Sequence, residues 1–382
     1  MDRRVDVLLI GGGVASVRCA RKLRRGGLSG SIVLVGQEAH PPYNRPPLSK
    51  ELLRDDLADE LAHAEPVAWY ERRDVELLTG RSVMALDADA RVASLDDGTS
   101  VAFERALLAT GAEPRRPRIP GAERAILLRT LDDARRIRSA ARPGVRAVII
   151  GGGFIGVEVA SSLATLGVEV TIVELASTLW GGSLGPELAA WARERLEETG
   201  VRVVTDAAAR AIEPDGVRVG GERLPAEMVI AGVGVSPREA LAQAAGIEVD
   251  DGIVTDARHE TSVTGIFAAG DAARVDGLRV EHWHAAREGG ERAALAMLGQ
   301  PVPPPRAPWV FSEVAGHHLD VVGWAPRWDA LRRIGESERF VLAYLVGGRV
   351  MQLAVVDDAF PVEEARSLVE RAPPLEDAAL SV

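Results

Sequence analysis

The pattern of apolar and polar positions occurs twice along the chain, and the second copy begins 140 positions after the first. In the first copy, residues 7–10 form a continuous apolar run of strand length, followed by glycines, an alanine-rich helical pattern over residues 14–23 and a second apolar run over residues 32–35. Continuous apolar strands are typical of parallel sheets that are covered on both faces. The pattern therefore predicts a β-α-β unit near the N-terminus.

The second copy follows the same order. Its first apolar run covers residues 147–150, its helical pattern residues 154–166 and its next, mainly apolar run residues 168–173. The sequence thus shows the order strand, glycines, helix, strand twice. This repeat predicts an α/β protein with two Rossmann-like domains.

The glycines of the second copy predict a dinucleotide site. Gly151, Gly153 and Gly156 have the G-x-G-x-x-G spacing where a strand hands over to a helix, and Glu174 closes the next strand. In such a motif the glycines make a tight turn, admit a pyrophosphate and allow close packing, while the acid binds the ribose hydroxyls. A glycine turn without a ligand is the alternative.

Glu174 also predicts a preference for NADH over NADPH. A 2′-phosphate beside this carboxylate would cost about 4 kcal/mol at a separation of roughly 4 Å and an effective dielectric constant near 20. The next three residues, 175–177, contain no arginine that could offset the repulsion.

The first copy departs from this fingerprint. Ser16 stands at the third glycine position, and either Gln37 or Glu38 would reach a ribose. A small serine still permits close packing, so we expect a second dinucleotide here. Cys19, on the same predicted helix, is expected to be a small buried apolar residue.

Composition narrows the chemistry further. The chain has 382 residues, a net charge of −11 and a single cysteine. One cysteine excludes an intrachain disulfide and a four-thiolate metal centre. Redox chemistry therefore needs a bound cofactor, and no metal site is expected.

The net negative charge disfavours nucleic acid as a partner, and no apolar run is long enough for a membrane helix. The N-terminus lacks a cleavable-signal layout, so a cytoplasmic location is expected.

Two dinucleotide folds in one chain favour FAD paired with a nicotinamide, and several short segments support this pairing. These segments are residues 42–50 (PYNRPPLSK), 109–111 (ATG), 231–237 (AGVGVSP), 265–271 (GIFAAGD), 281–286 (EHWHAA) and 308–312 (PWVFS). In order and spacing the sequence resembles the FAD-dependent pyridine-nucleotide oxidoreductases, and within them the ferredoxin and rubredoxin reductase group.

The resemblance implies an α/β fold with two glutathione-reductase-like domains and a small α+β interface domain. The FAD domain would comprise residues 1–113 and 241–304, the NAD domain residues 114–240 and the interface domain residues 305–382. The implied cofactors are FAD and NADH. The implied acceptor is a ferredoxin-like [2Fe-2S] protein that serves a P450 or Rieske oxygenase, and the reductase would be a monomer or homodimer.

The resemblance also implies roles for individual residues. Lys50 would face the flavin, with Glu158 either pairing with it or acting only near the start of its own helix. Trp283 would lie beside the nicotinamide or be a plain core aromatic, and Phe154 or Ile155 would bound the nicotinamide pocket. The remaining residues expected to bind a cofactor are Gly11, Gly13, Val14, Ala15, Gln37, Glu38, Arg45, Ala109, Thr110, Gly111, Arg129, Gly270, Asp271, His282, Ala286, Gly151, Gly153, Gly156, Glu174, Gly232, Val233 and Gly234.

The acceptor is the least constrained part of the prediction. Members of the group often have tryptophan where Phe311 stands and an aromatic residue where Val310 stands. These differences keep open direct reduction of oxygen, a quinone or a small metabolite. A redox-sensing interaction protein is a third possibility. An acidic ferredoxin could bind an arginine group, although a solvated helix face is the commoner explanation. The arginines are Arg115, Arg116, Arg118, Arg135, Arg136 and Arg138.

Overall fold

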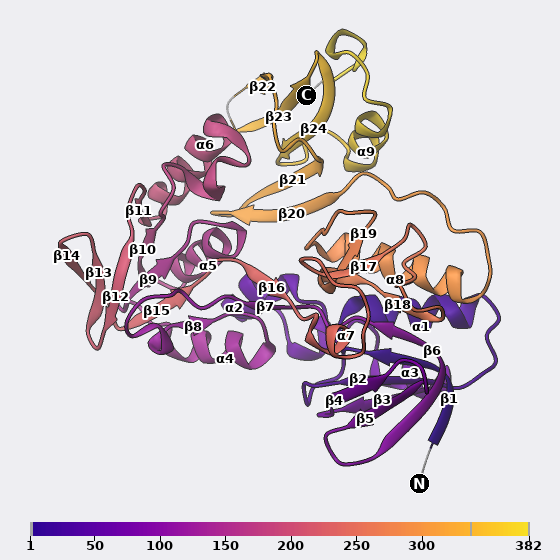
Figure 1. Cartoon of the computed structure of the whole chain (residues 1–382). Coiled ribbons are helices and arrows are strands. Elements are labelled where there is room, and N and C mark those ends of the chain that lie inside the picture. The colour runs from indigo at the N-terminus through magenta and orange to yellow at the C-terminus, as the bar shows by residue number, and fades with distance from the viewer. Residues whose placement is uncertain (1–2, 337, 381–382) are drawn as a thin grey trace. The chain divides into compact units, whose positions relative to one another are not determined.

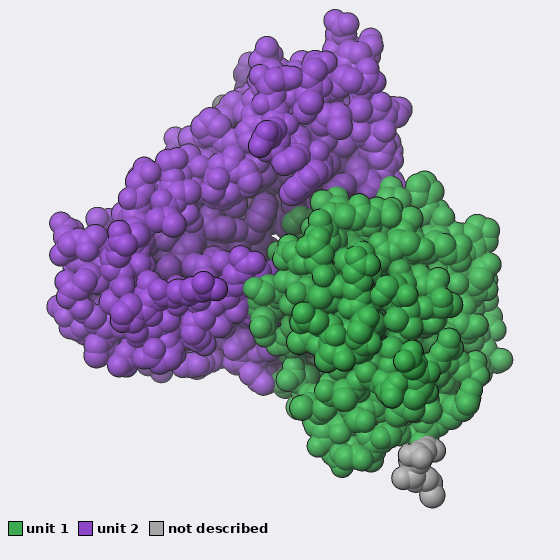
Figure 2. Space-filling model, in the orientation of Figure 1, with its two compact units in different colours: residues 1–44, 59–113, 236–305 green, residues 45–58, 114–235, 306–382 purple. Residues whose placement is uncertain are grey.

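A computed structural model describes residues 3–336 and 338–380. Their contacts divide the chain into two units, coloured green and purple in Figure 2. Unit 1 contains the chain up to residue 44 and residues 59–113 and 236–305, whereas unit 2 contains residues 45–58, 114–235 and 306 onward. The chain therefore passes between the units several times, and the segment that contains Lys50 belongs to unit 2.

Unit 1 is built on the first β-α-β repeat, which appears at the indigo end of the chain in Figure 1. Its strands are β1 (Arg3–Ile10), β2 (Ile32–Gly36), β3 (Val75–Thr79), β4 (Val83–Asp87), β5 (Val92–Leu95), β6 (Ser100–Leu108), β7 (Ala112–Pro114), β16 (Val235–Pro237), β17 (Ile253–Thr255), β18 (Ile266–Ala268) and β19 (Ala273–Val275). Its helices are α1 (Val14–Arg25), α3 (Val67–Arg72), α7 (Ala240–Ala244) and α8 (Trp283–Met297).

The main sheet of unit 1 has the order β3-β2-β1-β6-β5-β4, and β18 also pairs with β6. The pairs β1–β2, β1–β6, β2–β3 and β6–β18 are parallel, whereas β4, β5 and β6 form an antiparallel meander. The register places Val7 opposite Ile32 and Ile10 opposite Val35. Both parallel neighbours of β1 thus end at the same edge as the glycines that follow Ile10.

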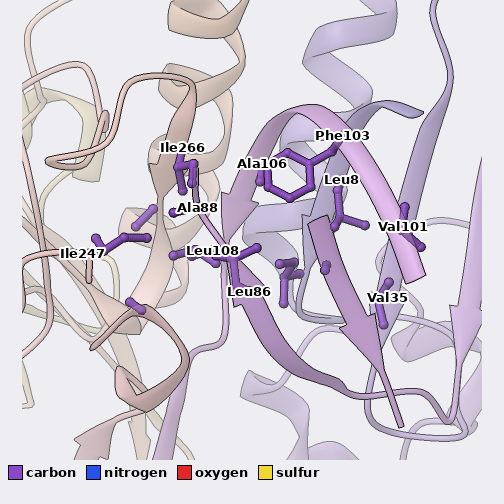
Figure 3. Packing of buried hydrophobic residues seen from close by; sticks show 14 of the residues in the cluster. Leu8, Val35, Leu86, Ala88, Val101, Phe103, Ala106, Leu108, Ile247 and Ile266 are labelled. Carbon is purple, nitrogen blue, oxygen red and sulfur yellow. The ribbon is translucent and has the colours of Figure 1, made fainter. Parts of the chain in front are cut away.

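Burial follows from the apolar runs. Val7, Leu8 and Leu9 are each 0% exposed, as expected for a central strand that is covered on both faces. Figure 3 shows one of the two cores, in which Leu8, Val35, Phe103, Leu108 and neighbouring side chains pack together. The other core lies where α1 and α8 cover the opposite face, and it includes Cys19 at 0% exposure. The prediction that Cys19 is a buried apolar residue is confirmed.

Unit 2 contains the second repeat. Its strands are β8 (Ile126–Leu127), β9 (Arg146–Ile150), β10 (Glu169–Val173), β11 (Arg202–Val204), β12 (Ala209–Glu213), β13 (Gly216–Val219), β14 (Glu222–Pro225), β15 (Met228–Ala231), β20 (Trp309–Val314), β21 (His317–Gly323), β22 (Ala330–Glu336), β23 (Arg339–Val346) and β24 (Arg349–Val356). Its helices are α2 (Glu51–Arg54), α4 (Leu131–Ala140), α5 (Phe154–Thr165), α6 (Gly185–Glu198) and α9 (Val362–Arg371).

Two kinds of sheet make up unit 2. The order β11-β10-β9-β15-β8 is parallel throughout, and β12, β13 and β14 form a small antiparallel sheet. The C-terminal sheet, β20-β21-β24-β23-β22, is antiparallel, with α9 packed on β21 and β24 (Figure 1). The α/β fold with two Rossmann-like parts and an α+β C-terminal part is confirmed. Among the described residues, no helix is long and apolar enough to cross a membrane.

Close packing of α1 against α8 gives a prediction about stability. A Cβ at Gly290, in α8, would lie 2.1 Å from the backbone carbonyl oxygen of Ala15, so Gly290→Ala forces the two helices apart. We expect a loss of about 1–3 kcal/mol and a melting temperature lower by several degrees. Thermal unfolding followed by circular dichroism measures this. In the control, Gly221→Ala, the added Cβ meets open space, and an equal loss in both variants would contradict the packing argument.

Candidate functional site

At the first glycine turn, in unit 1, two other backbone segments lie very close to Gly11. Gly11 has φ +121° and donates its N–H to Val35 O at 2.8 Å, and a Cβ on Gly11 would lie 2.0 Å from Ala109 O. Gly13 caps α1 without a side-chain hydrogen bond. The first-turn N–H groups of α1, which include those of Val14 and Ala15, therefore face no capping side chain, as an anion site at a helix start requires.

Three segments distant in sequence meet at this turn. A Cβ at Gly270, which has φ +76°, would lie 3.5 Å from the Cβ of Ala15 and 3.6 Å from that of Ala286. All three were predicted to bind the first cofactor. Burial lowers the pKa of His282, which caps α8, while the nearby Asp271 carboxylate opposes that change. The imidazole of His282 is thereby favoured in its neutral form.

The predicted ribose ligands at this turn already have partners. Gln37 accepts a hydrogen bond from Arg238 at 3.0 Å, and Glu38 accepts one from the Tyr43 hydroxyl. The ATG turn is held by the same Arg238, whose carbonyl accepts the Thr110 hydroxyl at 2.6 Å and whose N–H donates to Gly111 O at 2.9 Å. Residues 37 and 110–111 are thus tied to one loop.

Trp283, the first residue of α8, is held inside unit 1. Its indole N–H donates to Asn44 Oδ1 at 3.0 Å, and the Arg287 guanidinium lies 4.6 Å from the centre of the ring. The side chain is half-buried. These contacts fix the orientation of the ring within unit 1.

The second glycine turn, in unit 2, repeats the geometry of the first. Gly151 has φ +107°, and a Cβ there would lie 2.4 Å from Gly232 O, in the loop that also contains Val233 and Gly234. A Cβ at Gly156 would lie 2.0 Å from Gly151 O. Gly153 caps α5 without a side-chain hydrogen bond. Contacts inside the protein therefore require glycine at positions 151 and 156, independently of any pyrophosphate.

Glu174 is positioned by backbone amides. One carboxylate oxygen accepts the N–H of Gly152 at 2.6 Å and the other that of Ala176 at 2.7 Å. The carboxylate thus lies beside the glycine turn, where the sequence places it, and it adds negative charge there. Phe154 is half-buried and Ile155 is exposed at the start of α5.

A buried ion pair lies within unit 2. Lys50 Nζ is 2.7 Å from Glu158 Oε2, and the two side chains are only 7% and 4% exposed. Ser49 donates its hydroxyl to Glu158 Oε2, and Ser312 donates its own to Oε1 at 2.7 Å. The predicted pairing of Lys50 with Glu158 is confirmed. The Phe311 ring lies beside the pair, 5.6 Å from Lys50 Nζ.

The two serines are functional candidates that sequence reasoning missed. Both lie in segments that were singled out, residues 42–50 and 308–312, but nothing in either segment indicates a shared partner on α5. Arg45, in the first segment, donates to the backbone carbonyl of Arg129, so these two predicted cofactor residues also meet.

Three of the arginines considered for partner binding have internal partners in the structure. Arg138 pairs with Asp55 at 2.6 Å, Arg135 with Asp132 at 3.1 Å, and Arg116 donates to the carbonyl of Ala122 at 2.7 Å. The carboxylate of Asp55 raises the pKa of Arg138. These contacts fit a solvated, paired surface better than one reserved for a partner.

Breaking the buried pair gives a second prediction. Glu158→Ala leaves the Lys50 ammonium buried without its counter-ion, and we expect a cost of about 3–5 kcal/mol in the free energy of unfolding. Lys50→Met together with Glu158→Leu removes both charges and should recover most of that loss. Chemical denaturation of the two variants tests this, and a double variant no more stable than Glu158→Ala would show that the pair is not the cause.

Comparison with known proteins agrees with this geometry. Residues 5–290 match the model of the family described as pyridine nucleotide-disulphide oxidoreductase. The chain is 40% identical to the ferredoxin–NAD(+) reductase component of the biphenyl dioxygenase system of Paraburkholderia xenovorans, over 83% of this chain and 80% of that protein. It is 36% identical to the chlorobenzene dioxygenase ferredoxin reductase component of Cupriavidus sp., over 98% and 95%.

A solved structure shows the same likeness. Putidaredoxin reductase, in its covalent complex with putidaredoxin, superimposes with a TM-score of 0.94 at 32% identity, over 99% of this chain and 96% of that one. With two glycine turns of matching geometry and a family match over most of its length, the chain belongs to the pyridine nucleotide-disulphide oxidoreductases.

Proposed function

We propose that this protein is an NADH-dependent flavoprotein reductase that passes electrons through FAD to a ferredoxin-type [2Fe-2S] protein serving an oxygenase. The observation that carries the proposal is the combination of two dinucleotide turns with a chain whose single cysteine, Cys19, is buried at 0% exposure. A second thiol is missing from the sequence, so a dithiol relay of the disulfide-reducing kind cannot operate. The electrons then go to an external acceptor.

The residues of unit 1 fit FAD. The uncapped start of α1 offers N–H groups to a pyrophosphate, and Gly11 and Gly270 add no side chains of their own beside it. Asp271 would bind the ribityl chain. FAD accepts two electrons as a hydride and releases them one at a time, which is what a one-electron iron–sulfur acceptor requires.

The protein's part in the reaction is positioning and electrostatics. Lys50 is held by Glu158, Ser49 and Ser312, so its ammonium keeps one position without reorganising. We assign it to hydrogen bonding at the flavin ring, where it would favour the reduced, anionic form. With both coenzymes bound, these residues would move no proton: their part would be to hold the charge of Lys50 at a fixed position.

The coenzyme is assigned from unit 2. Glu174, bound to the amides of Gly152 and Ala176, leaves a carboxylate beside the ribose position and favours NADH over a 2′-phosphorylated coenzyme. We assign the FAD domain to residues 1–113 and 241–304, the NAD domain to 114–240 and the interface domain to 305–382. We place the reaction in the cytoplasm, where NADH is supplied.

The acceptor is assigned by similarity. Relatives that the chain matches over more than four fifths of its length are named as ferredoxin reductase components of dioxygenase systems. One observation favours an alternative acceptor. Phe311, beside the Lys50–Glu158 pair, stands where the group often has tryptophan. Direct reduction of oxygen, a quinone or a small metabolite is the second candidate.

Stopped-flow spectroscopy distinguishes the two candidate classes of electron acceptor. We expect NADH to bleach the flavin rapidly and NADPH to do so much more slowly. A [2Fe-2S] ferredoxin should then speed flavin reoxidation well beyond the rate with oxygen alone. If ferredoxin leaves the rate unchanged while a quinone accelerates it, the second candidate replaces the first.

A further inference from the structure

The loop after β10 contains a left-handed turn that the activity proposed above does not explain. Trp180, Gly181 and Gly182 have φ angles of +58°, +60° and +79°. Glycine adopts this conformation freely, whereas a bulky aromatic residue there is a conformational outlier. Such outliers persist where the surrounding structure holds them, and they gather at functional sites.

The turn is fastened to the second glycine turn. The backbone N–H of Trp180 donates to Gly152 O at 2.8 Å, and the carbonyl of Trp180 accepts both the N–H and the hydroxyl of Ser183, at 3.1 and 2.8 Å. The Leu179 side chain covers Gly152, because a Cβ there would lie 2.7 Å from Leu179 Cδ2. The position of residue 180 is therefore tied to the turn that carries the dinucleotide motif.

The indole ring of Trp180 packs against Phe154. The two ring centres are 5.8 Å apart with planes inclined by 41°. Trp180 is 6% exposed, whereas Phe154, the first residue of α5, is only half-buried. Trp180 thus supports the Phe154 ring, while Phe154 as a residue remains partly exposed at the helix start.

The indole N–H of Trp180 adds a second unfavourable feature. It is buried, and within the described residues it has no hydrogen-bond acceptor. A buried donor without an acceptor is destabilising, as is the positive φ of the same residue. Glycine at this position would remove both features, so what tryptophan contributes is its ring against Phe154.

We propose that Trp180 is a positioning residue that holds Phe154 in the orientation in which it bounds the nicotinamide end of bound NADH. The proposal rests on the NADH site proposed above and adds a residue that acts through Phe154. In this proposal, different residues bind the two ends of the coenzyme. The glycine turn and Glu174 bind the adenine and pyrophosphate part, whereas Phe154, supported by Trp180, contacts the nicotinamide part.

The test compares NAD⁺ with ADP-ribose, which lacks the nicotinamide, as ligands of the flavin-loaded enzyme in calorimetry. Trp180→Gly keeps the left-handed turn free of strain and removes the ring. We expect this variant to bind ADP-ribose within about twofold of wild type, but NAD⁺ roughly 3- to 10-fold more weakly, the range of an aromatic pair. Trp180→Phe, which keeps a ring, should restore NAD⁺ affinity.

A double-variant cycle checks the route through Phe154. In a Phe154→Ala background, Trp180→Gly should cause no further loss of NAD⁺ affinity. Equal losses for both ligands, or no loss for either, would overturn the role of Trp180 while leaving the coenzyme site in place. Failure of the wild type to bind either ligand would overturn the proposed function along with it.

Discussion

A close approach of two backbone segments is the constraint on which both nucleotide turns depend. In unit 1 the carbonyl of Ala109 lies where a side chain on Gly11 would stand, and in unit 2 the carbonyl of Gly232 does the same at Gly151. In each case the carbonyl follows a parallel neighbour of the first strand, β6 or β15. A glycine with positive φ is the residue that fits this arrangement. The ATG and AGVG segments thus have one structural task in common: each closes a glycine turn from the side.

The second organising feature is the buried Lys50–Glu158 pair, which is an electrostatic interaction and not a close packing of backbone segments. A desolvated ion pair contributes little net stability, yet breaking it is costly. This asymmetry suits a group that must stay charged in a fixed place. Two serine hydroxyls also donate to this carboxylate, one to each oxygen, so the position of the ammonium is set by residues from three separate segments. Preorganisation of this type is how a protein stabilises charge without moving at the moment of reaction.

The local pattern of apolar residues and glycines was sufficient to predict the secondary structure of the two repeats. The apolar runs and glycines predicted both repeats, and the structure places α1 at Val14–Arg25 and α5 at Phe154–Thr165, within two residues of the expected ends. The burial of Cys19 followed from its position on α1. By contrast, the bonds from Ser49 and Ser312 to Glu158 join segments far apart in the chain, and no periodicity encodes them. The left-handed Trp180 was also beyond sequence reasoning, because propensity opposes a bulky residue there and only tertiary contacts hold it.

We propose that this single chain binds a flavin at one glycine turn and its reductant at the other, and that no dithiol relays the electrons. Anaerobic titration of the purified protein with NADH, followed by visible absorbance and by extraction of the bound flavin, measures this most directly. We expect one FAD per chain, bleached fully by about one equivalent of NADH, since each hydride carries two electrons. A colourless protein that takes up no added flavin, or a bound flavin that NADH leaves oxidised, would contradict it.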